Sequence, residues 1–194
     1  MTYLLIAAAY LLGSISSAIL VCRAWGLPNP RSQGSKNPGA TNVKRIGGNA
    51  TAAVTLAGDL LKGALPVLTG HILGLDPLWL MLTGAAAFLG HLYPLFFEFR
   101  GGKGVATLLG VLLAFDLVLG LAVAGTWLLV AKGFRLSSLS ALIATALAPL
   151  YAWMLQIDTR TITVLMFMVA LLWWRHRGNI RRLMQGDEDR IRKS

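Results

Sequence analysis

The sequence RGGKGVATLLG, residues 100–110, has the composition of a phosphate-binding loop. Its glycines are Gly101, Gly102 and Gly104. Because they carry no side chains, they leave the backbone N–H groups open to a ligand. The apolar residues from Val105 onward predict a helix, and the free N–H groups and positive dipole of a helix N-terminus favour an anion. Lys103 adds a mobile point charge for phosphate oxygens. The alternative is a glycine hinge with one lysine on the cytoplasmic side of a membrane.

This glycine loop does not match the nucleotide-binding signature G-x-x-x-x-G-K-[ST]. Phe97 stands where the first glycine of that signature belongs, and Gly104 replaces its final Ser or Thr. The sequence therefore predicts a loop that binds phosphate groups, and not ATP.

A second polar segment, GSKNPGATNVKRIGG at residues 34–48, combines small hydrogen-bonding residues with cations and turn-forming glycines. Its neutral hydrogen-bonding residues are Ser35, Thr41 and Asn42, and its cations are Lys36, Lys44 and Arg45. Ordinary loops seldom place so many hydroxyl and amide groups among glycines, which permit tight turns and close backbone approach. This favours a binding segment over the alternative, a plain cytoplasmic loop.

The third polar segment is WWRHRGNIRRLMQGDEDR, residues 173–190. His176 and Asn179 are three residues apart, so they share a face if the helix continues. His176 is the only histidine in this basic segment and can act as a proton donor or base. The alternative is an amphipathic tail that lies on anionic lipid headgroups.

The composition requires a membrane around these segments. Hydrophobic residues make up 56% of 194 residues, charged residues only 13%, and the mean hydropathy is +0.65. The apolar blocks are residues 4–21, 50–73, 78–97, 105–131, 136–155 and 161–174. Several approach the roughly 20 residues that a membrane-spanning helix needs. The net charge of +10 then marks the cytoplasmic side and not nucleic-acid binding. The single cysteine, Cys22, excludes an intramolecular disulfide and disfavours a metal site built on cysteine.

The positions of Lys and Arg predict the topology. They cluster at residues 23–45, 100–103, 132–135 and 175–193, and the positive-inside rule places all four clusters in the cytoplasm. This requires an even number of spans between clusters, so residues 105–131 must break into two short spans near Asp116. We therefore expect a single all-α integral membrane domain over residues 1–194. It has about seven transmembrane helices, an outside N-terminus and a cytoplasmic C-terminus, and all three polar segments lie on the cytoplasmic face.

Other charged residues receive lesser roles. Asp59 and Lys62, at i and i+3 inside a predicted span, are expected to form an ion pair that faces the helix bundle, and an intramembrane charge is also a functional candidate. His91 and Glu98 flank the glycine loop and are expected to orient it. The polar segments offer no well-placed carboxylate beyond Glu98.

The three polar segments together resemble the signature segments of the bacterial acyl-phosphate-dependent glycerol-3-phosphate acyltransferases. The likeness rests on GSKNPGATNVKRIGG, HLYPLFFEFRGGKGVAT and RHRGNIRRLMQGDEDR, and on their order and placement between spans. It covers nearly the whole chain. Any one glycine–lysine loop is a weak signal, but the combination is specific.

The resemblance implies a seven-helix enzyme of the bacterial inner membrane, with its active site facing the cytoplasm. Such an enzyme transfers a fatty acyl chain from acyl phosphate to the sn-1 hydroxyl of glycerol 3-phosphate, releasing lysophosphatidic acid and phosphate. The resemblance assigns catalysis to Ser35, Lys103, His176 and Asn179. It assigns substrate binding to Lys36, Thr41, Asn42, Arg45, Gly101, Gly102 and Gly104. Other enzymes of phospholipid synthesis become candidate partners.

The residues themselves agree with this chemistry. Two phosphate-bearing substrates explain the convergence of cationic, glycine-rich loops, and a fatty tail explains a site at the membrane edge. Acyl phosphate is an activated mixed anhydride, so the transfer requires no metal, cofactor or acyl-enzyme. His176 and a substrate phosphate oxygen are both candidates for the general base. The rival class is a small organic-phosphate transporter, which the largely apolar spans and the lack of an internal repeat disfavour.

Overall fold

A computed structural model describes residues 1–191 of the chain; Arg192 and Lys193, which end the last basic cluster, lie outside them. Within residues 1–191 the regular elements are all helical, which confirms the predicted all-α class. They are α1 (Thr2–Gly13), α2 (Ser17–Ala24), α3 (Ala40–Ile72), α4 (Pro77–Leu92), a 3₁₀ turn η1 (Leu95–Phe97), α5 (Val105–Phe115), α6 (Leu117–Phe134), α7 (Ser137–Met154), α8 (Thr159–Arg175) and α9 (Arg177–Gln185).

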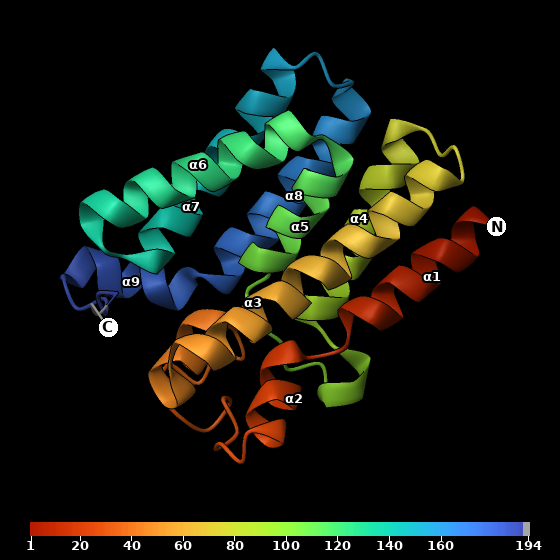
Figure 1. Ribbon diagram of the computed structural model, residues 1–194. Coiled ribbons are helices and arrows are strands. Elements are labelled where there is room, and N and C mark those ends of the chain that lie inside the picture. The colour runs from red at the N-terminus through yellow and green to blue at the C-terminus, as the bar shows by residue number, and fades with distance from the viewer. Residues whose placement is uncertain (192–194) are drawn as a thin grey trace.

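The core is built around α4. Its side chains Phe88 and Leu92 are fully buried and belong to one apolar cluster with Leu108 of α5 and Leu172 of α8. α4 packs against α1, α3, α5 and α8, and α6 packs against α5 and α7 (Figure 1). The glycine loop that leads into α5 and the break at Asp116 that ends it therefore both adjoin the buried core.

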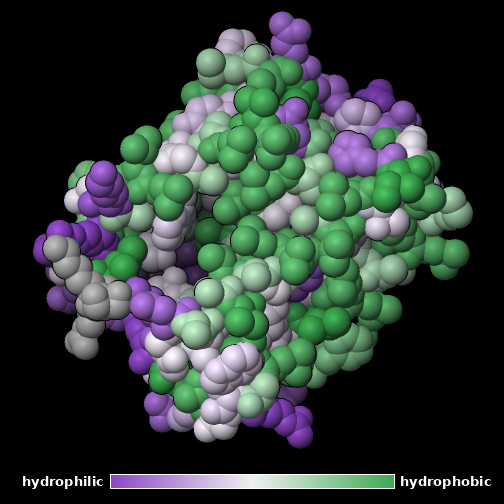
Figure 2. All heavy atoms as spheres, viewed as in Figure 1, coloured by the Kyte–Doolittle hydropathy of each residue, from purple (hydrophilic) through white to green (hydrophobic). Residues whose placement is uncertain are grey.

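The outer surface is largely apolar, as a lipid-facing surface is. On α6, Leu128 is 61% exposed and Leu129 is 75% exposed. Figure 2 shows apolar residues over most of one face, with a hollow between α3 and α6 whose floor is hydrophilic. In the described part of the chain, residues 1–191, four helices are long and apolar enough to cross a membrane: α3, α4 with η1, α6 and α7. The α1–α2 pair, bent by 41°, makes up to five.

The long apolar run of residues 105–131 is broken where the sequence predicts. Asp116 has an extended backbone and ends α5 after 11 residues. Its carboxylate accepts a hydrogen bond from the Leu119 N–H at 2.8 Å and so caps α6. An acid is accommodated at a helix boundary, where its carboxylate caps a free N–H group, at a much lower cost than in the middle of an apolar helix.

The second polar segment begins α3, but a kink separates it from the apolar part of that helix. Gly48 has φ +86°, a conformation that non-glycine residues rarely adopt, and the helix changes direction there. The first turns of α3, the start of α7, and α9 gather at the lower left of the molecule in Figure 1. The Thr41 and Ser137 hydroxyls, 3.2 Å apart, and the Arg45–Asp189 ion pair join these elements.

Candidate active site

The glycine loop, residues 101–104, is tied to the end of α4. The Gly101 N–H donates to the Leu92 carbonyl and the Gly102 N–H donates to the His91 carbonyl, both at 3.2 Å. These two N–H groups are therefore already used, in contrast to the expectation that they face a phosphate. Among residues 1–191, no carbonyl or side chain accepts from the N–H groups of residues 103–107, which lead into α5. The anion-binding end of the loop is this later part.

At two positions of the glycine loop a side chain would collide with neighbouring groups. Gly104 adopts φ +87°, and a side chain there would meet the ring of Phe88. A side chain at Gly102 would meet the imidazole of His91 and, at 3.0 Å, the carbonyl of Pro38. The second contact shows that the second polar segment lies directly against the glycine loop.

Lys103 points from the glycine loop to the third polar segment. Its Nζ donates to Oδ1 of the buried Asn179 at 2.6 Å. The pKa of Lys103 is lowered to about 8, mainly by burial; the Glu188 carboxylate raises it, and the positive charges of Arg182, Arg45 and Arg175 lower it. Lys103 thus sits in a group of cations that carries excess positive charge.

The Glu188 carboxylate accepts hydrogen bonds from three side chains around Lys103. Its Oε1 accepts from Asn179 Nδ2 at 2.6 Å and from the Ser138 hydroxyl at 2.7 Å, and its Oε2 accepts from Arg182 Nε at 2.7 Å. Burial raises the pKa of Glu188, but these hydrogen bonds outweigh it and leave the pKa below its usual value. The expectation that the polar segments hold no well-placed carboxylate beyond Glu98 is therefore wrong. Ser138, at the start of α7, is also a residue that the sequence did not indicate.

His176 is buried at the junction of α8 and α9, 3% exposed. Its Nδ1 lies 2.8 Å from the Leu172 carbonyl, which can only accept, so the proton is on Nδ1 and Nε2 carries a lone pair. Burial is the main cause that lowers the pKa of His176 to about 4, with contributions from Lys103 and Arg175. The imidazole is neutral at pH 7 and offers an acceptor.

Arg175, the last residue of α8, fastens the third polar segment to the glycine loop. Its Nη2 donates to the Gly101 carbonyl at 2.7 Å and its Nε donates to the Gly102 carbonyl at 3.1 Å. Its guanidinium also stacks 5.6 Å from the centre of the Tyr93 ring. The sequence indicated this arginine only as part of a basic cluster.

In the second polar segment, Asn42 is buried and holds the loop in place, whereas Ser35 is exposed. The Asn42 amide donates to the carbonyls of Pro30 and Gln33 at 2.9 and 3.0 Å and accepts from the Ser35 N–H at 2.9 Å. Asn42 therefore holds the loop together, and both of its amide N–H groups are used in doing so. The Ser35 side chain is exposed on the loop that Asn42 fixes.

Thr41 and Arg45, one helical turn apart, reach other elements. The Thr41 hydroxyl lies 3.2 Å from that of Ser137 at the start of α7, and Arg45 Nη1 pairs with Asp189 at 3.2 Å. Arg45 thus lies on the Lys103 side of the glycine loop, bonded to the acidic stretch that follows α9.

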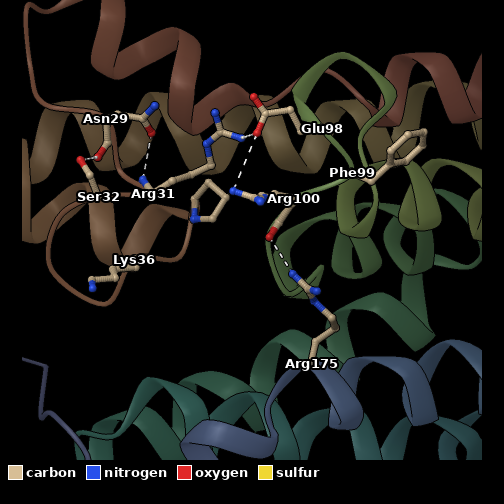
Figure 3. A pocket seen from close by; sticks show the side chains of 10 residues that line it. Asn29, Arg31, Ser32, Lys36, Glu98, Phe99, Arg100 and Arg175 are labelled. Atoms are coloured by element: carbon tan, nitrogen blue, oxygen red, sulfur yellow. Dashed lines mark hydrogen bonds and ion pairs between the residues drawn. The ribbon is translucent and has the colours of Figure 1, made fainter.

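Lys36 lies on the other side of the loop, in a pocket of about 480 Å³. The pocket is lined by Asn29, Arg31, Ser32, Lys36, Pro38, Glu98, Phe99, Arg100, Gly101 and Arg175 (Figure 3). Arg31 Nη1 lies 3.8 Å and Arg100 Nη1 4.0 Å from the Glu98 carboxylate, which is 70% exposed. Four cations and one acid line this pocket, and the two ion pairs to Glu98 are long and involve an exposed carboxylate. Among residues 1–191, no three His, Cys, Asp or Glu side chains are grouped to hold a metal ion.

Comparison with known proteins identifies the family. The family model described as glycerol-3-phosphate acyltransferase matches residues 3–186. Relatives of that name from Hydrogenovibrio crunogenus and Thioalkalivibrio sulfidiphilus are 59% and 56% identical, over 97% and 96% of this chain and 90% and 92% of theirs. The chain belongs to the glycerol-3-phosphate acyltransferase family.

Similar solved structures agree with this family assignment. The crystal structure of PlsY, an integral membrane glycerol 3-phosphate acyltransferase in its glycerol 3-phosphate form, is similar with a TM-score of 0.93 and 38% identity, over 97% of this chain and 94% of that one. Its lysophosphatidic acid form gives 0.90 and 37%. These matches confirm the family, the enzyme class and the multi-pass membrane character predicted from the sequence.

Proposed function

We propose that this acyltransferase moves a fatty acyl group from acyl phosphate to the sn-1 hydroxyl of glycerol 3-phosphate, giving lysophosphatidic acid and phosphate. The acceptor and product follow from the family and from the ligand forms of the similar PlsY structures. One observation carries the location of the site. The hydrogen-bond chain from Lys103 through Asn179 to Glu188 brings the glycine loop, α9 and α7 together amid excess positive charge.

The donor is inferred from the leaving group that the site suits. In the transfer, the glycerol hydroxyl oxygen bonds to the acyl carbon, the bond from that carbon to the phosphate oxygen breaks, and phosphate departs. Lys103 and the unpaired N–H groups that lead into α5 are placed to stabilise an oxyanion or the departing phosphate. Arg45 and Arg182 are the cations for the phosphate of the acceptor. Because phosphate is itself a good leaving group, no acyl-enzyme is needed.

The general base is a phosphate oxygen of a substrate in this proposal. The pKa of His176 is about 4, whereas a phosphate monoester has a second pKa of about 6. The phosphate is therefore the stronger base by roughly two pKa units. The His176 Nε2 lone pair instead accepts a hydrogen bond that orients the substrate. Ser35 and Asn179 keep roles in positioning it.

Assay of the purified protein tests the donor. With glycerol 3-phosphate as acceptor, acyl phosphate should give lysophosphatidic acid and inorganic phosphate in equal amounts. The same acyl chain on coenzyme A or on acyl carrier protein should give none. Turnover only with a thioester would overturn the donor, and transport of glycerol 3-phosphate into sealed vesicles without acylation would favour the transporter alternative.

We also propose the seven-span topology, with the N-terminus outside and the site on the cytoplasmic face of the inner membrane. Helices stand at each predicted span, and the basic segments gather at one end of the bundle. Residues 1–194 act as one domain in this proposal. Association with other enzymes of phospholipid synthesis stays a prediction.

Thiol labelling tests the topology. Cys22 is first replaced, and single cysteines are placed at Ser35, Gly186 and Asp76. An impermeant reagent added outside intact spheroplasts should label only the Asp76 position. Labelling of a cysteine at Gly186 from outside would contradict the proposal. It would mean that the number of proposed spans is wrong by an odd number.

A further inference from the structure

Three charged or ionisable side chains lie together inside the bundle, behind the glycine loop. They are Asp59 and Lys62 of α3 and His91 of α4, and their side chains are 3%, 5% and 6% exposed. Lys62 Nζ lies 2.9 Å from Asp59 Oδ1, and His91 Nδ1 lies 3.5 Å from the same oxygen. We call these three residues the buried polar cluster.

The buried polar cluster is anchored at its far end by the break between α1 and α2. Lys62 Nζ donates to the Ile15 carbonyl at 2.8 Å. Ile15 lies between the end of α1 at Gly13 and the start of α2 at Ser17, so its carbonyl is free of a helical partner. The ammonium therefore joins α3 to the first bent helix pair as well as to Asp59.

At its near end the cluster contacts the glycine loop through His91. The His91 carbonyl accepts the Gly102 N–H, and the imidazole Nε2 occupies the space that a side chain on Gly102 would fill. One residue thus fixes Gly102 through both its backbone and its ring. Gly102 directly precedes Lys103, so movement of His91 displaces the lysine.

Stability alone is a poor explanation for these residues. Charged side chains buried at membrane depth are costly, and apolar residues of the same volume often stabilise a protein as well or better. What an anchored ion pair supplies is a fixed position. The series of contacts Ile15–Lys62–Asp59–His91–Gly102 runs from the α1–α2 break through α3 and α4 to the loop that carries Lys103. Its step from Asp59 to His91 is a close approach of 3.5 Å without a hydrogen bond.

We propose that Asp59, Lys62 and His91 are positioning residues for acyl transfer, which hold the glycine loop so that Lys103 and the start of α5 meet the phosphate. The identity of that phosphate rests on the proposed function, but the positioning does not. The cluster touches the loop and acts through it.

A double-mutant cycle between His91 and Gly102 tests the contact. Gly102→Ala should lower kcat by about 100-fold because the new methyl group meets the imidazole. His91→Ala should lower kcat by about tenfold. In the His91→Ala background, Gly102→Ala should cost less than about tenfold more, since the space is open. Effects that simply multiply would overturn the proposed contact.

A charge-neutral variant tests the ion pair without leaving an unpaired charge. Asp59→Asn combined with Lys62→Met keeps the shape of both side chains and removes both charges. We expect a folded protein whose kcat is at least about tenfold lower and whose KM for glycerol 3-phosphate changes less than about threefold. An unchanged kcat in this folded variant would overturn the proposal.

Control and rescue variants separate positioning from general stability. Thr83→Ala removes another fully buried polar side chain of α4, two turns before His91, and should lower the unfolding temperature in detergent without lowering kcat. His91→Asn keeps a donor near the Nδ1 position and should retain more kcat than His91→Ala. If kcat in all variants merely followed the unfolding temperature, the role would be structural and the proposal wrong.

The donor question is kept apart from this test. The double-mutant cycle is run with whichever acyl donor the wild-type enzyme turns over. The positioning proposal can therefore be tested even if the proposed donor is wrong. Calorimetric titration of glycerol 3-phosphate into each variant gives a second measurement. Unchanged binding with reduced kcat supports positioning of the loop, whereas loss of binding in step with kcat would overturn it.

Discussion

The two sides of the glycine loop carry similar numbers of cations but hold them differently. On the Lys103 side, Asn179 and Glu188 link the lysine to α7 and α9 by hydrogen bonds of 2.6 and 2.7 Å, and the Glu188 side chain is 8% exposed. On the pocket side, Arg31 and Arg100 share the exposed Glu98 at 3.8 and 4.0 Å. Short, buried bonds fix a charge in place, whereas long, exposed pairs contribute little.

This difference assigns the two sides different work. A fixed cation in a desolvated place stabilises charge that develops during reaction, because it needs no reorganisation at that moment. Loosely held, solvated cations raise the local concentration of an anionic substrate. We therefore expect chemistry on the Lys103 side and attraction of substrate on the pocket side. The predictions below take the largest expected effect first.

Removing the Lys103 charge should have the largest effect. Lys103→Met should lower kcat/KM by about 100- to 1000-fold in a folded protein, as the loss of a preorganised charge does. Lys103→Arg should recover only part of this, since a planar guanidinium does not replace a compact ammonium. Steady-state kinetics in detergent measure both. Near-normal turnover by Lys103→Met would end the assignment of chemistry to this side.

Substitutions of His176 show whether its imidazole acts as a base or only accepts a hydrogen bond. His176→Ala should lower kcat by about 100-fold and change KM less. His176→Gln places a carbonyl oxygen near the position of Nε2 but cannot take up a proton at neutral pH. We expect it to keep kcat within about tenfold of wild type, consistent with a phosphate as base. A loss as large as that of His176→Ala would instead make His176 the base.

The pH dependence of activity tests whether the charge of Lys103 is needed for the reaction. Lys103 is charged below its pKa of about 8 and neutral above it, so activity should fall as the pH rises through 8. At one pH unit above the pKa, roughly a tenth of the protein keeps the charge, and kcat/KM should fall about tenfold. In Lys103→Arg the residual activity should be flat over this range, because the guanidinium stays protonated. An alkaline limb that persists unchanged in Lys103→Arg would belong to another group.

Much of this fold could be read from the sequence for simple physical reasons. Asp116 marks a helix boundary because an acid inside an apolar run is too costly, and the boundary is where it was predicted. The three polar segments contact one another, as expected for segments that span parity and the positive-inside rule assign to one face. Glycines around Lys103 mark the loop.

The partners within the site could not be read in the same way. Glu188 stands in GDEDR, which resembles a solvated tail, and only the return of that stretch to α7 makes it a ligand of Asn179 and Ser138. The N–H groups of Gly101 and Gly102 looked free because the sequence does not show that α4 ends beside them. Such contacts depend on how helices far apart in the chain pack, which no local pattern contains.

The pocket side should show the smallest effect, and its form distinguishes attraction from chemistry. Arg100, whose side chain is 79% exposed, is changed to Gln, and Arg31 is changed to Gln beside it. At low ionic strength KM for glycerol 3-phosphate should rise about two- to threefold with kcat unchanged. Above about 0.5 M salt, where exposed charges are screened beyond a few ångströms, wild type and variant should converge. Lys103→Met should keep its full loss at the same salt, because a buried charge is screened far less. A salt-independent fall in kcat for Arg100→Gln would place reacting groups in this pocket, and the two sides of the glycine loop would then share the chemistry.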